Sequence, residues 1–445
     1  MLMTRALPLL LPLALALPAA ADDDPKSIAA RKAAHRPRMS YLDNGTLKLG
    51  VDLNLGGAVT YLSRAGADAN VVNNWDWGRQ IQMSHYAGPA PFRVPGKEPA
   101  KAWATFPWNP VQAGDHFGYA SKVIESSNDG TELVVRCRPT QWSLPDVSCE
   151  TTFESRIKLD GNTARVRCTV TNARADRTRY GAFDQELPAV YVNGPYHKLL
   201  SYTGDRPFGG GALTQVKKQP GESPGFPWAR FFATEHWAAQ VNDAGRGLGV
   251  YQRGCVRFLG GFAGRPGKGG TTDAPTGYIA PVREEVLDHD VEYRYEYALI
   301  LGTLDEIRTR AVALHGKPAA PRYAFDANRQ GWHVRGGTDR GWRLTGEWDV
   351  TGKAPELVGP FDFWRADEAP TLTLDAAFTA ADVRVYWATL DAPTFHADRS
   401  LAVPALRDGV TRVNLAAAAG YRGALVRLRL DPGGPARLRS VGLGN

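Results

Sequence analysis

Apolar and polar residues alternate over short runs along much of the chain. In residues 132–137 and 165–170, charged and apolar side chains take turns, which is typical of antiparallel strands with one face in water. Asn-Gly and Asp-Gly turn signals end at Gly45, Gly130 and Gly161. The runs expected to form strands are residues 47–53, 131–137, 151–159, 164–170 and 291–301. The pattern predicts an all-β fold, built as an antiparallel β-sandwich.

One run has the spacing of a helix instead. Residues 304–314 carry a single apolar stripe, formed by Leu304, Ile307, Ala311 and Leu314. Thr303 is a suitable N-cap, and the two acidic residues that follow Leu304 favour the start of the helix. Gly316 and Pro318 end it, so we expect a linker at residues 316–323 and a domain boundary there.

The segment after this linker, residues 324–445, has the length and turn density of a smaller jelly-roll-like β-sandwich. It opens with Phe325-Asp326 and Gly331-Trp332. In this layout it resembles the carbohydrate-binding-module-like sandwiches that are appended to secreted polysaccharide enzymes. Its tryptophans have two interpretations, stacking on sugar rings or packing in the core, and they are Trp332, Trp342, Trp348 and Trp364.

The N-terminus has the features of a secretory signal peptide. Arg5 precedes an apolar run at residues 6–17, and Ala19-Ala20-Ala21 forms a cleavage site before three aspartates. The apolar run is too short for a bilayer, which needs about 20 residues. We therefore expect residues 1–21 to be removed, residues 22–40 to form an N-terminal linker, and the mature protein to be secreted or periplasmic without a membrane span.

Charge and cysteine content limit the classes of partner and cofactor that we expect the protein to bind. The formal net charge is +7, but basic and acidic residues are interspersed, so we expect no nucleic-acid binding. The mildly basic charge has two interpretations, attraction to an acidic polysaccharide or an ordinary solvated surface. The four cysteines include no C-x-x-C pair, so we expect no metal and no cofactor. A cross-strand disulfide among Cys137, Cys149 and Cys168 is expected, with the pairing left open.

The region with the clearest motifs is residues 44–82. A strand ending at Asp52 is followed by Gly56-Gly57, a second strand to Leu62, and then Gly78-Arg79. In these motifs the chain resembles the galactose-mutarotase-like superfamily, whose members are large antiparallel β-supersandwiches that act on or bind sugars. The resemblance implies such a domain at residues 41–315, with Arg79 and Gln82 as sugar contacts. The histidine acid and glutamate base of typical aldose epimerases match no motif here, so no catalytic pair is carried over.

Sugar sites combine flat aromatic faces with polar groups that bind hydroxyls. One stretch supplies both, and its candidate substrate-binding residues are Trp75, Trp77, Arg79, Gln82 and Tyr86. Since neighbouring strand residues point to opposite faces, Ile81 and Met83 are expected in the core. Gln80, Gln82 and Tyr86 then face the cleft.

Three further groups are candidates for chemistry. A loop at residues 103–119 holds Trp108, a possible sugar contact, and His116 beside Asp115, a possible acid–base unit. Asp184 and Glu186 alternate with Gln185, so both carboxylates should face the same way, Asp184 binding substrate and Glu186 acting in catalysis. Glu235 and His236 enter a strand hairpin as two more catalytic candidates.

Three functions fit these groups. The first is cleavage of glycosidic bonds of a polysaccharide, either by hydrolysis with Glu186 and Glu235 as the pair, or by β-elimination with a base such as His116, His236 or Tyr86 and with Arg79 neutralising the substrate. The second is carbohydrate binding without catalysis, and the third is a structural envelope sandwich. Residues 260–269 only partly match a phosphate loop, and no H-E-x-x-H or G-x-S-x-G motif is present.

Overall fold

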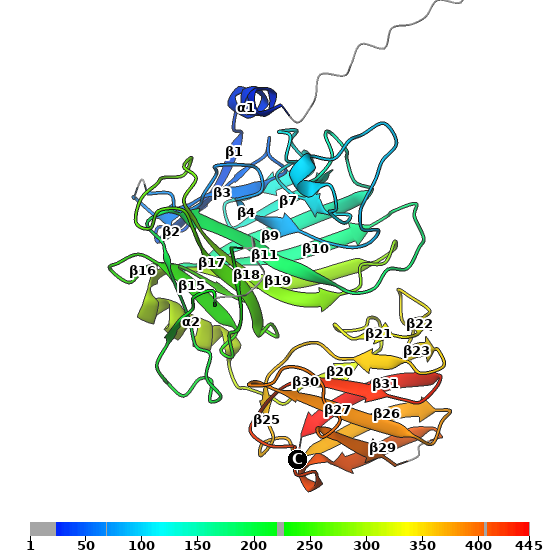
Figure 1. Ribbon diagram of the computed structural model, residues 1–445. Helices are drawn as coiled ribbons and strands as arrows, with labels where there is room; N and C mark the ends of the chain where they lie inside the picture. The colour runs from blue at the N-terminus through cyan, green and yellow to red at the C-terminus, as the bar shows by residue number, and fades with distance from the viewer. Residues whose placement is uncertain (1–23, 68, 220–226, 405–406, 445) are drawn as a thin grey trace, which may run out of the picture.

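The computed structural model describes residues 24–67, 69–219, 227–404 and 407–444 (Figure 1). The predicted signal peptide, residues 1–21, lies outside this range. The described chain is nearly all β, as the sequence predicts, and forms two domains with separate hydrophobic cores. The residues of the first core fall between Leu42 and Leu301 in the sequence, and those of the second between Tyr323 and Leu443. None of the helices in the described ranges is long and apolar enough to cross a membrane.

The first domain is a sandwich of two antiparallel sheets (Figure 1). We call them the front sheet and the back sheet. The front sheet has, in spatial order, β1 (Met39–Asp43), β2 (Leu47–Asp52), β3 (Ala58–Arg64), β4 (Ile81–Ser84), β11 (Phe183–Asn193), β18 (Thr276–Glu285), β17 (Arg257–Ala263) and β14 (Ala229–Phe232), with β5 (Pro110–Val111) and β8 (Thr140–Gln141) paired off β4.

The back sheet pairs its strands in the order β13 (Thr214–Gln215), β12 (Lys198–Ser201), β15 (Trp237–Val241), β16 (Arg246–Tyr251), β19 (Glu292–Thr303), β10 (Thr163–Asn172), β9 (Thr151–Asp160), β7 (Glu132–Arg138) and β6 (Lys122–Asn128). The five strands expected from alternation are all present, as β2, β7, β9, β10 and β19. Their turns hold Gly45, Gly130 and Gly161 at φ values of 80°, 85° and 57°, a conformation that favours glycine.

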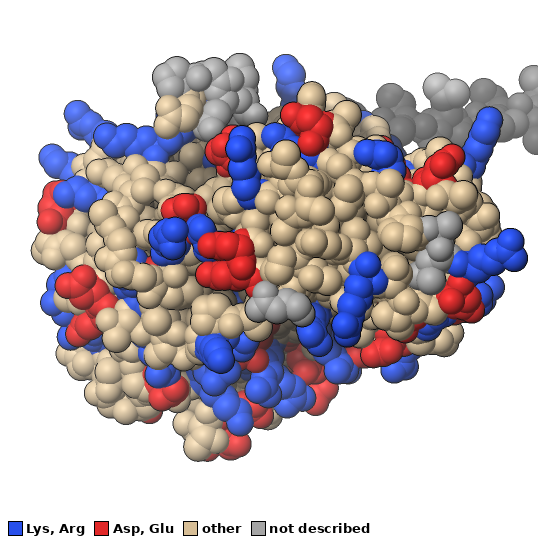
Figure 2. All heavy atoms as spheres, turned by 90° about the horizontal axis from the view of Figure 1, so that it is seen from below, with Lys and Arg blue, Asp and Glu red and all other residues tan. Residues whose placement is uncertain are grey.

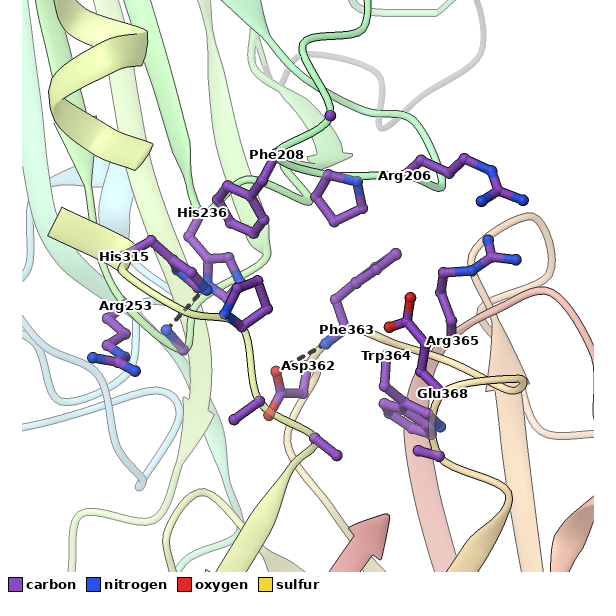
Figure 3. Close-up of a pocket in the computed structure, with 17 residues that line it drawn as sticks. Arg206, Phe208, His236, Arg253, His315, Asp362, Phe363, Trp364, Arg365 and Glu368 are labelled. Carbon is purple, nitrogen blue, oxygen red and sulfur yellow. Dashed lines mark hydrogen bonds between the residues drawn. The ribbon is translucent and has the colours of Figure 1, made fainter. Parts of the chain in front are cut away.

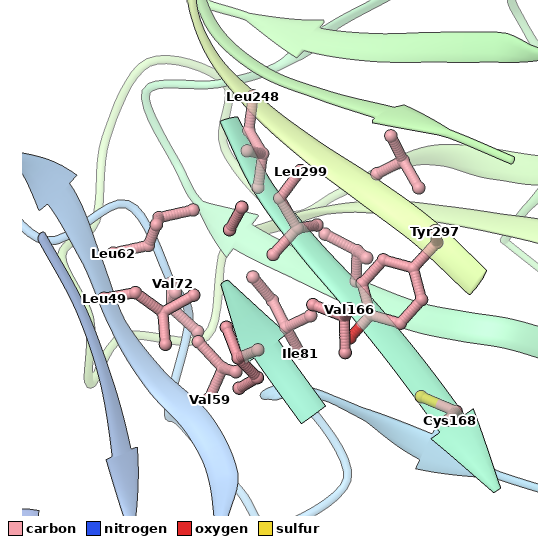
Figure 4. Close-up of a cluster of buried hydrophobic side chains, with 14 of the residues drawn as sticks. Leu49, Val59, Leu62, Val72, Ile81, Val166, Cys168, Leu248, Tyr297 and Leu299 are labelled. Atoms are coloured by element: carbon pink, nitrogen blue, oxygen red, sulfur yellow. The ribbon is translucent and has the colours of Figure 1, made fainter. Parts of the chain in front are cut away.

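The core of this domain is the apolar layer between the two sheets (Figure 4). Front-sheet residues such as Val59 and Ile81 meet back-sheet residues such as Val166 and Leu299 there, and all four are buried. The alternate residues of each strand point to the outer faces of the sandwich. The outer face of the front sheet is where the candidate site lies.

Two α-helices flank the first domain (Figure 1). The predicted helix is confirmed as α2 (Leu304–His315), where Thr303 and Glu306 form a reciprocal capping box and Ile307 is buried. The expected N-terminal linker instead contains α1 (Pro25–Ala34), which starts because Asp24 caps it and proline is favoured in the first turn. There are also two short 3₁₀ helices, η1 (Lys101–Trp103) and η2 (Leu415–Ala417).

The second domain also packs two antiparallel sheets face to face. One orders β22 (Thr338–Asp339), β23 (Trp348–Thr351), β31 (Ala436–Gly444), β26 (Thr371–Phe378) and β29 (Gly409–Asn414), with β20 (Arg322–Ala324) also on β31. The other orders β21 (His333–Arg335), β24 (Glu356–Val358), β30 (Ala424–Asp431), β27 (Val383–Thr389) and β28 (Ser400–Val403), with β25 (Trp364–Arg365) also on β30.

The tryptophans of the second domain mostly form its core. Trp332, Trp348 and Trp364 are no more than 5% exposed and belong to the buried cluster between its sheets, and Trp342 is partly buried. The core interpretation of these residues therefore holds for the first three. On the face shown in Figure 2, basic and acidic side chains are interspersed around a wide uncharged area, without a continuous basic array.

Buried charges join the two domains. Arg329 of the second domain lies 2.8 Å from Asp288 of the first and 2.6 Å from Asp339 of its own. Arg427 of β30 also pairs with Glu284 of β18. Because these side chains are mostly withdrawn from water, loss of one partner would leave an uncompensated charge. The ion pairs therefore fix the second domain against one end of the front sheet.

The expected cross-strand disulfide does not form, because all four cysteines are free and buried. Cys137 lies on β7 and Cys168 on β10, and β9 runs between those strands. Two strand spacings of about 4.8 Å separate such positions by more than the roughly 7 Å that a disulfide can bridge. Burial raises the pKa of both thiols to about 12.

Candidate functional site

The strand alternation at β4 follows the sequence prediction. Ile81 and Met83 are buried in the core between the sheets. His85 continues on the same side, with its ring against Phe153 at 5.3 Å. The intervening residues, including Ser84 and Tyr86, are therefore on the outer face of the front sheet.

Strand β11 runs beside β4 and brings two acids to the same face. Gln185 is buried, accepts a hydrogen bond from the Tyr86 backbone at 2.9 Å and contacts the His85 ring at 3.2 Å. Asp184 and Glu186 flank it and therefore share the outer face, as the alternation predicts. Glu186 is paired in register with Ser84 on one side and with Val282 of β18 on the other.

The Glu186 carboxyl is the centre of this face. The Tyr278 hydroxyl donates to Oε1 at 2.5 Å, and the Tyr86 hydroxyl donates to Oε2 at 3.2 Å. Burial raises the pKa of Glu186 above its ordinary value, although the hydrogen bonds from Tyr278 and Tyr86 act in the opposite direction. The side chain nevertheless remains partly accessible. A buried carboxyl whose pKa is raised in this way is a candidate for proton transfer.

An aromatic wall formed by Tyr191, Tyr278 and Trp228 stands beside Glu186, with Tyr278 fully buried and the other two rings partly exposed. The Tyr278 ring lies 4.6 Å from the Tyr191 ring and 4.8 Å from the Trp228 ring, tilted by 39° and 35°. Burial, with the charge of Glu186 next, raises the pKa of the Tyr191 and Tyr278 hydroxyls well above 10, and the same holds for Tyr86. These phenols therefore stay protonated and act as hydrogen-bond donors.

Asp76 and Arg79 lie close to the same wall. The Arg79 guanidinium is 3.3 Å from the Asp76 carboxylate and donates to the Ala274 carbonyl at 2.6 Å. Both charges act on the pKa of Tyr191, which Asp76 raises and Arg79 lowers. Trp75, next to this pair in sequence, is 50% exposed and offers an open ring face.

Asp184 marks the other end of the face. It forms an ion pair with Arg257 of β17, whose guanidinium lies 4.8 Å from the centre of the Phe361 ring. Phe361 belongs to the second domain, so that domain reaches the end of the site. Asp184 is thus available to a ligand only together with Arg257.

Other predicted substrate contacts are buried and not accessible to a ligand. Trp108 is 2% exposed, with Arg174 above its ring at 4.6 Å. Trp77 packs in a small cluster with Leu55. Gln82 is 1% exposed and accepts from the Ala113 backbone, which attaches the loop of residues 103–119 to β4. Gln82 thus points to the outer face, as its place in the alternation predicts, but the loop covers it.

The expected His116–Asp115 unit is not assembled. Asp115 accepts hydrogen bonds from the backbone of Tyr119 and Asp146, and burial raises its pKa to about 7. His116 instead accepts from the Trp103 indole at 3.3 Å, among other aromatic rings. The residues are adjacent in sequence, but their side chains serve different contacts.

Glu235 and His236 belong to the other side of the domain. Glu235 is fully buried and accepts two hydrogen bonds from Arg308 of α2, at 2.7 and 3.0 Å, and a third from the Trp237 indole at 3.0 Å. It shares no hydrogen-bond partner with Glu186. His236 faces a cavity between the two domains instead of the front sheet.

The main residues that the sequence did not single out are Tyr191, Tyr278 and Trp228. Tyr278 reaches Glu186 from 92 positions away, and only the pairing of β11 with β18 joins them. Alternation along β18 would have shown which residues share the face of Tyr278, but not which strand lies beside β18. Among the described residues, no group of three or more His, Cys, Asp or Glu side chains is arranged to hold a metal ion.

No protein-family model and no curated protein matches the chain. Among solved structures, it is similar to a putative aldose 1-epimerase from Escherichia coli K12, at 13% identity and a TM-score of 0.37 over 60% of this chain and 100% of that one. A galactose mutarotase-like protein from Lactobacillus casei gives 14% identity and a TM-score of 0.38 over 59% and 100%. A 4-alpha-glucanotransferase from Thermococcus litoralis gives 12% and 0.32 over 62% and 41%. The roles given to individual residues above rest on the geometry of this chain.

Proposed function

We propose that the outer face of the front sheet is a carbohydrate site and that Glu186 is its general acid in cleaving a glycosidic bond. The observation that supports this is a partly accessible carboxyl, held by two phenol hydroxyls beside aromatic rings, whose pKa burial raises. Sugar rings present C–H faces that stack on aromatic side chains and hydroxyls that accept from protonated phenols. This face supplies both.

The proposed step is proton transfer to the leaving oxygen. Protonated Glu186 donates its proton to the glycosidic oxygen as the bond between that oxygen and the anomeric carbon breaks. The carboxylate that remains is stabilised by the donated hydrogen bonds of Tyr278 and Tyr86. We assign Asp76, whose charge acts on Tyr191, to accept a proton from the incoming water as the water oxygen bonds to the anomeric carbon, and Arg79 orients the Asp76 carboxylate.

Hydrolysis fits this face better than β-elimination does. Elimination needs a base near neutral pH to remove a carbon-bound proton. Tyr86, Tyr191 and Tyr278 stay protonated because their pKa values are raised. The histidines that the sequence proposed as bases, His116 and His236, lie off the face.

A second candidate function is carbohydrate binding without catalysis. The exposed ring of Trp75 and the partly exposed rings of Tyr191 and Trp228, which pack on the buried Tyr278, would bind a sugar whether or not a bond is cleaved. Export to the periplasm or beyond the cell, inferred from residues 1–21, is part of the same proposal.

The test is the Glu186→Gln variant against a panel of neutral and acidic glycans. A hydrolase produces new reducing ends without the absorbance of unsaturated uronates, and the variant should lose about 100-fold to 10,000-fold in kcat. The matched control is Glu125→Gln, an exposed residue of β6. Unsaturated products would indicate elimination, and binding without turnover would favour the second candidate. A protein that neither binds nor cleaves any glycan would contradict both.

A further inference from the structure

A cavity of about 670 Å³ lies between the two domains, away from the front-sheet site (Figure 3). Phe208, His236 and His315 line it from the first domain, and Phe363, Trp364 and Glu368 from the second. Ligand sites commonly have this volume and occur at domain interfaces. The lining combines aromatic rings with three arginines, Arg206, Arg253 and Arg365, and with two acidic residues, Asp362 and Glu368.

Two residues of its wall have a backbone conformation that bulky side chains rarely adopt. Phe208 has a φ of 65° and His236 a φ of 62°, and the only other non-glycine residues with positive φ in the described ranges are Asp146 and Gln330. Such conformations persist only where the surroundings enforce them, and they cluster at functional sites. Here both strained residues place a ring on the same cavity.

Glu235 holds the Phe208 part of this geometry. Its carboxylate accepts a hydrogen bond from the Phe208 backbone at 2.9 Å while it is held by Arg308. The Phe208 ring then stacks on His315 at 4.3 Å, and His236 lies 4.7 Å from His315. Glu235 is thus a positioning residue for a wall of three rings.

The histidines of this wall are neutral hydrogen-bonding groups. The Gly254 backbone donates to His236 Nδ1 at 3.1 Å, so the proton of the neutral ring is on Nε2. Burial, followed by the charges of His315 and Arg253, lowers the pKa of His236 to about 3. His236 can therefore donate one N–H to a ligand without carrying a charge.

Two arginines of the cavity lining have no ion pair within the described residues, although the Arg206 charge lowers the pKa of Asp367. Arg206 and Arg253 lie on opposite sides of it in Figure 3. Among the residues that the structure describes, none gives either guanidinium a hydrogen bond or an ion pair. Arg365, by contrast, is paired with Asp205 and Asp367. Of the acidic lining, Asp362 already accepts from the Tyr323 hydroxyl at 2.9 Å and from the Phe363 backbone at 2.8 Å.

We propose that this cavity binds a small acidic saccharide, a pyranose that carries a carboxylate or a phosphate. The anionic group pairs with Arg206 or Arg253 and accepts from His236 Nε2, and the ring packs against Phe208 and Phe363. Guanidinium groups bind both kinds of oxyanion in the same way. The proposal concerns a second site and holds whether or not the front sheet is catalytic.

The experiment is isothermal titration calorimetry of the full chain with digalacturonate, glucose 6-phosphate and neutral maltose. We expect one acidic ligand to bind and maltose not to bind, and the acidic ligand that binds identifies the carboxylate or the phosphate as the recognised group. The Arg206→Gln/Arg253→Gln double variant should weaken Kd at least about tenfold, because it removes charged hydrogen bonds. Both residues are exposed, so the variant should fold as the parent does.

Two further variants separate the alternatives. His236→Asn removes the ring, but asparagine tolerates positive φ, so it should also weaken binding. Arg177→Gln, an exposed arginine without a described partner, is the matched control and should bind as the parent does. The proposal is overturned if neither acidic ligand binds, if maltose binds as well as they do, or if the double variant equals Arg177→Gln. It is also overturned if Glu186→Gln abolishes binding and the double variant does not, since the ligand would then occupy the front sheet.

Discussion

Replacing Glu235 by glutamine distinguishes a structural carboxylate from a catalytic one. Glu235 is fully buried, and its partner Arg308 is 18% exposed at the side chain. The substitution leaves the Arg308 charge without its counter-charge and turns an amide N–H₂ towards a donor. Breaking a buried ion pair costs about 3–5 kcal/mol, and the partial hydration of Arg308 places this case near about 3 kcal/mol.

The assay is urea unfolding at pH 7 followed by tryptophan fluorescence, run beside initial rates of glycan cleavage. We expect Glu235→Gln to unfold at a clearly lower urea concentration than Glu125→Gln, while cleavage by the folded protein stays within about twofold of the parent at low temperature. Glu186→Gln should show the opposite result, lost cleavage with unchanged stability. A second substitution, Arg308→Gln, should recover part of the loss in Glu235→Gln, because it removes the unpaired charge.

One result would refute this reasoning. If Glu235→Gln unfolded like the parent but lost cleavage, Glu235 would be a catalytic group. Glu186 and Glu235 would then be the catalytic pair, as the sequence suggested.

Three other predictions follow from the same contacts. Tyr278→Phe removes the 2.5 Å hydrogen bond to Glu186, so kcat should fall about tenfold or more. The pKa on the alkaline limb of the pH–rate profile should move up, because the carboxylate loses a stabilising donor. An unchanged profile would show that Tyr278 does not act on the catalytic acid. Arg329→Met leaves Asp288 and Asp339 without their buried cation. Calorimetry should show a loss of about 3–5 kcal/mol in the free energy of unfolding and separate melting of the two domains. A single transition at the parent temperature would contradict the role of Arg329 in joining the domains. Burial lowers the pKa of His85 to about 4, so its neutral form contributes stability that is present above pH 6.5 and is lost as the pH falls towards 4. His85→Gln should therefore flatten the dependence of the urea midpoint on pH in that window. An equal slope in the variant and the parent would argue against a buried neutral ring.

The sequence predicted correctly those features that depend on residues close together in the chain. Alternation placed Ile81 and Met83 inside and Asp184 and Glu186 on one face, and the capping residues located α2. These features depend on neighbours within a few residues, whose geometry is fixed by the strand or helix period. The predicted acid–base unit of Asp115 and His116 did not form for a related reason. That the two residues are adjacent in sequence does not determine which backbone groups the Asp115 carboxylate binds.

The composition of the site could not be predicted without the order of the strands in the sheet. Glu186 and Tyr278 meet because β11 pairs with β18, and Trp228 joins them from the segment before β14. Nothing in a single sequence fixes those pairings. Burial was equally hidden: Trp75 and Trp77 are two residues apart, yet one is 50% exposed and the other 7%. Glu235 looked like a catalytic acid because its partner, Arg308, lies 73 positions further on.

The most direct test of the account is a crystal structure of the Glu186→Gln variant soaked with the glycans that the panel identifies. We predict a sugar ring stacked on Tyr191 or Trp228, the partly exposed rings of the aromatic wall, with its glycosidic oxygen within hydrogen-bonding distance of the residue 186 amide. A sugar bound elsewhere on the molecule, with this wall empty, would contradict the assignment of the site.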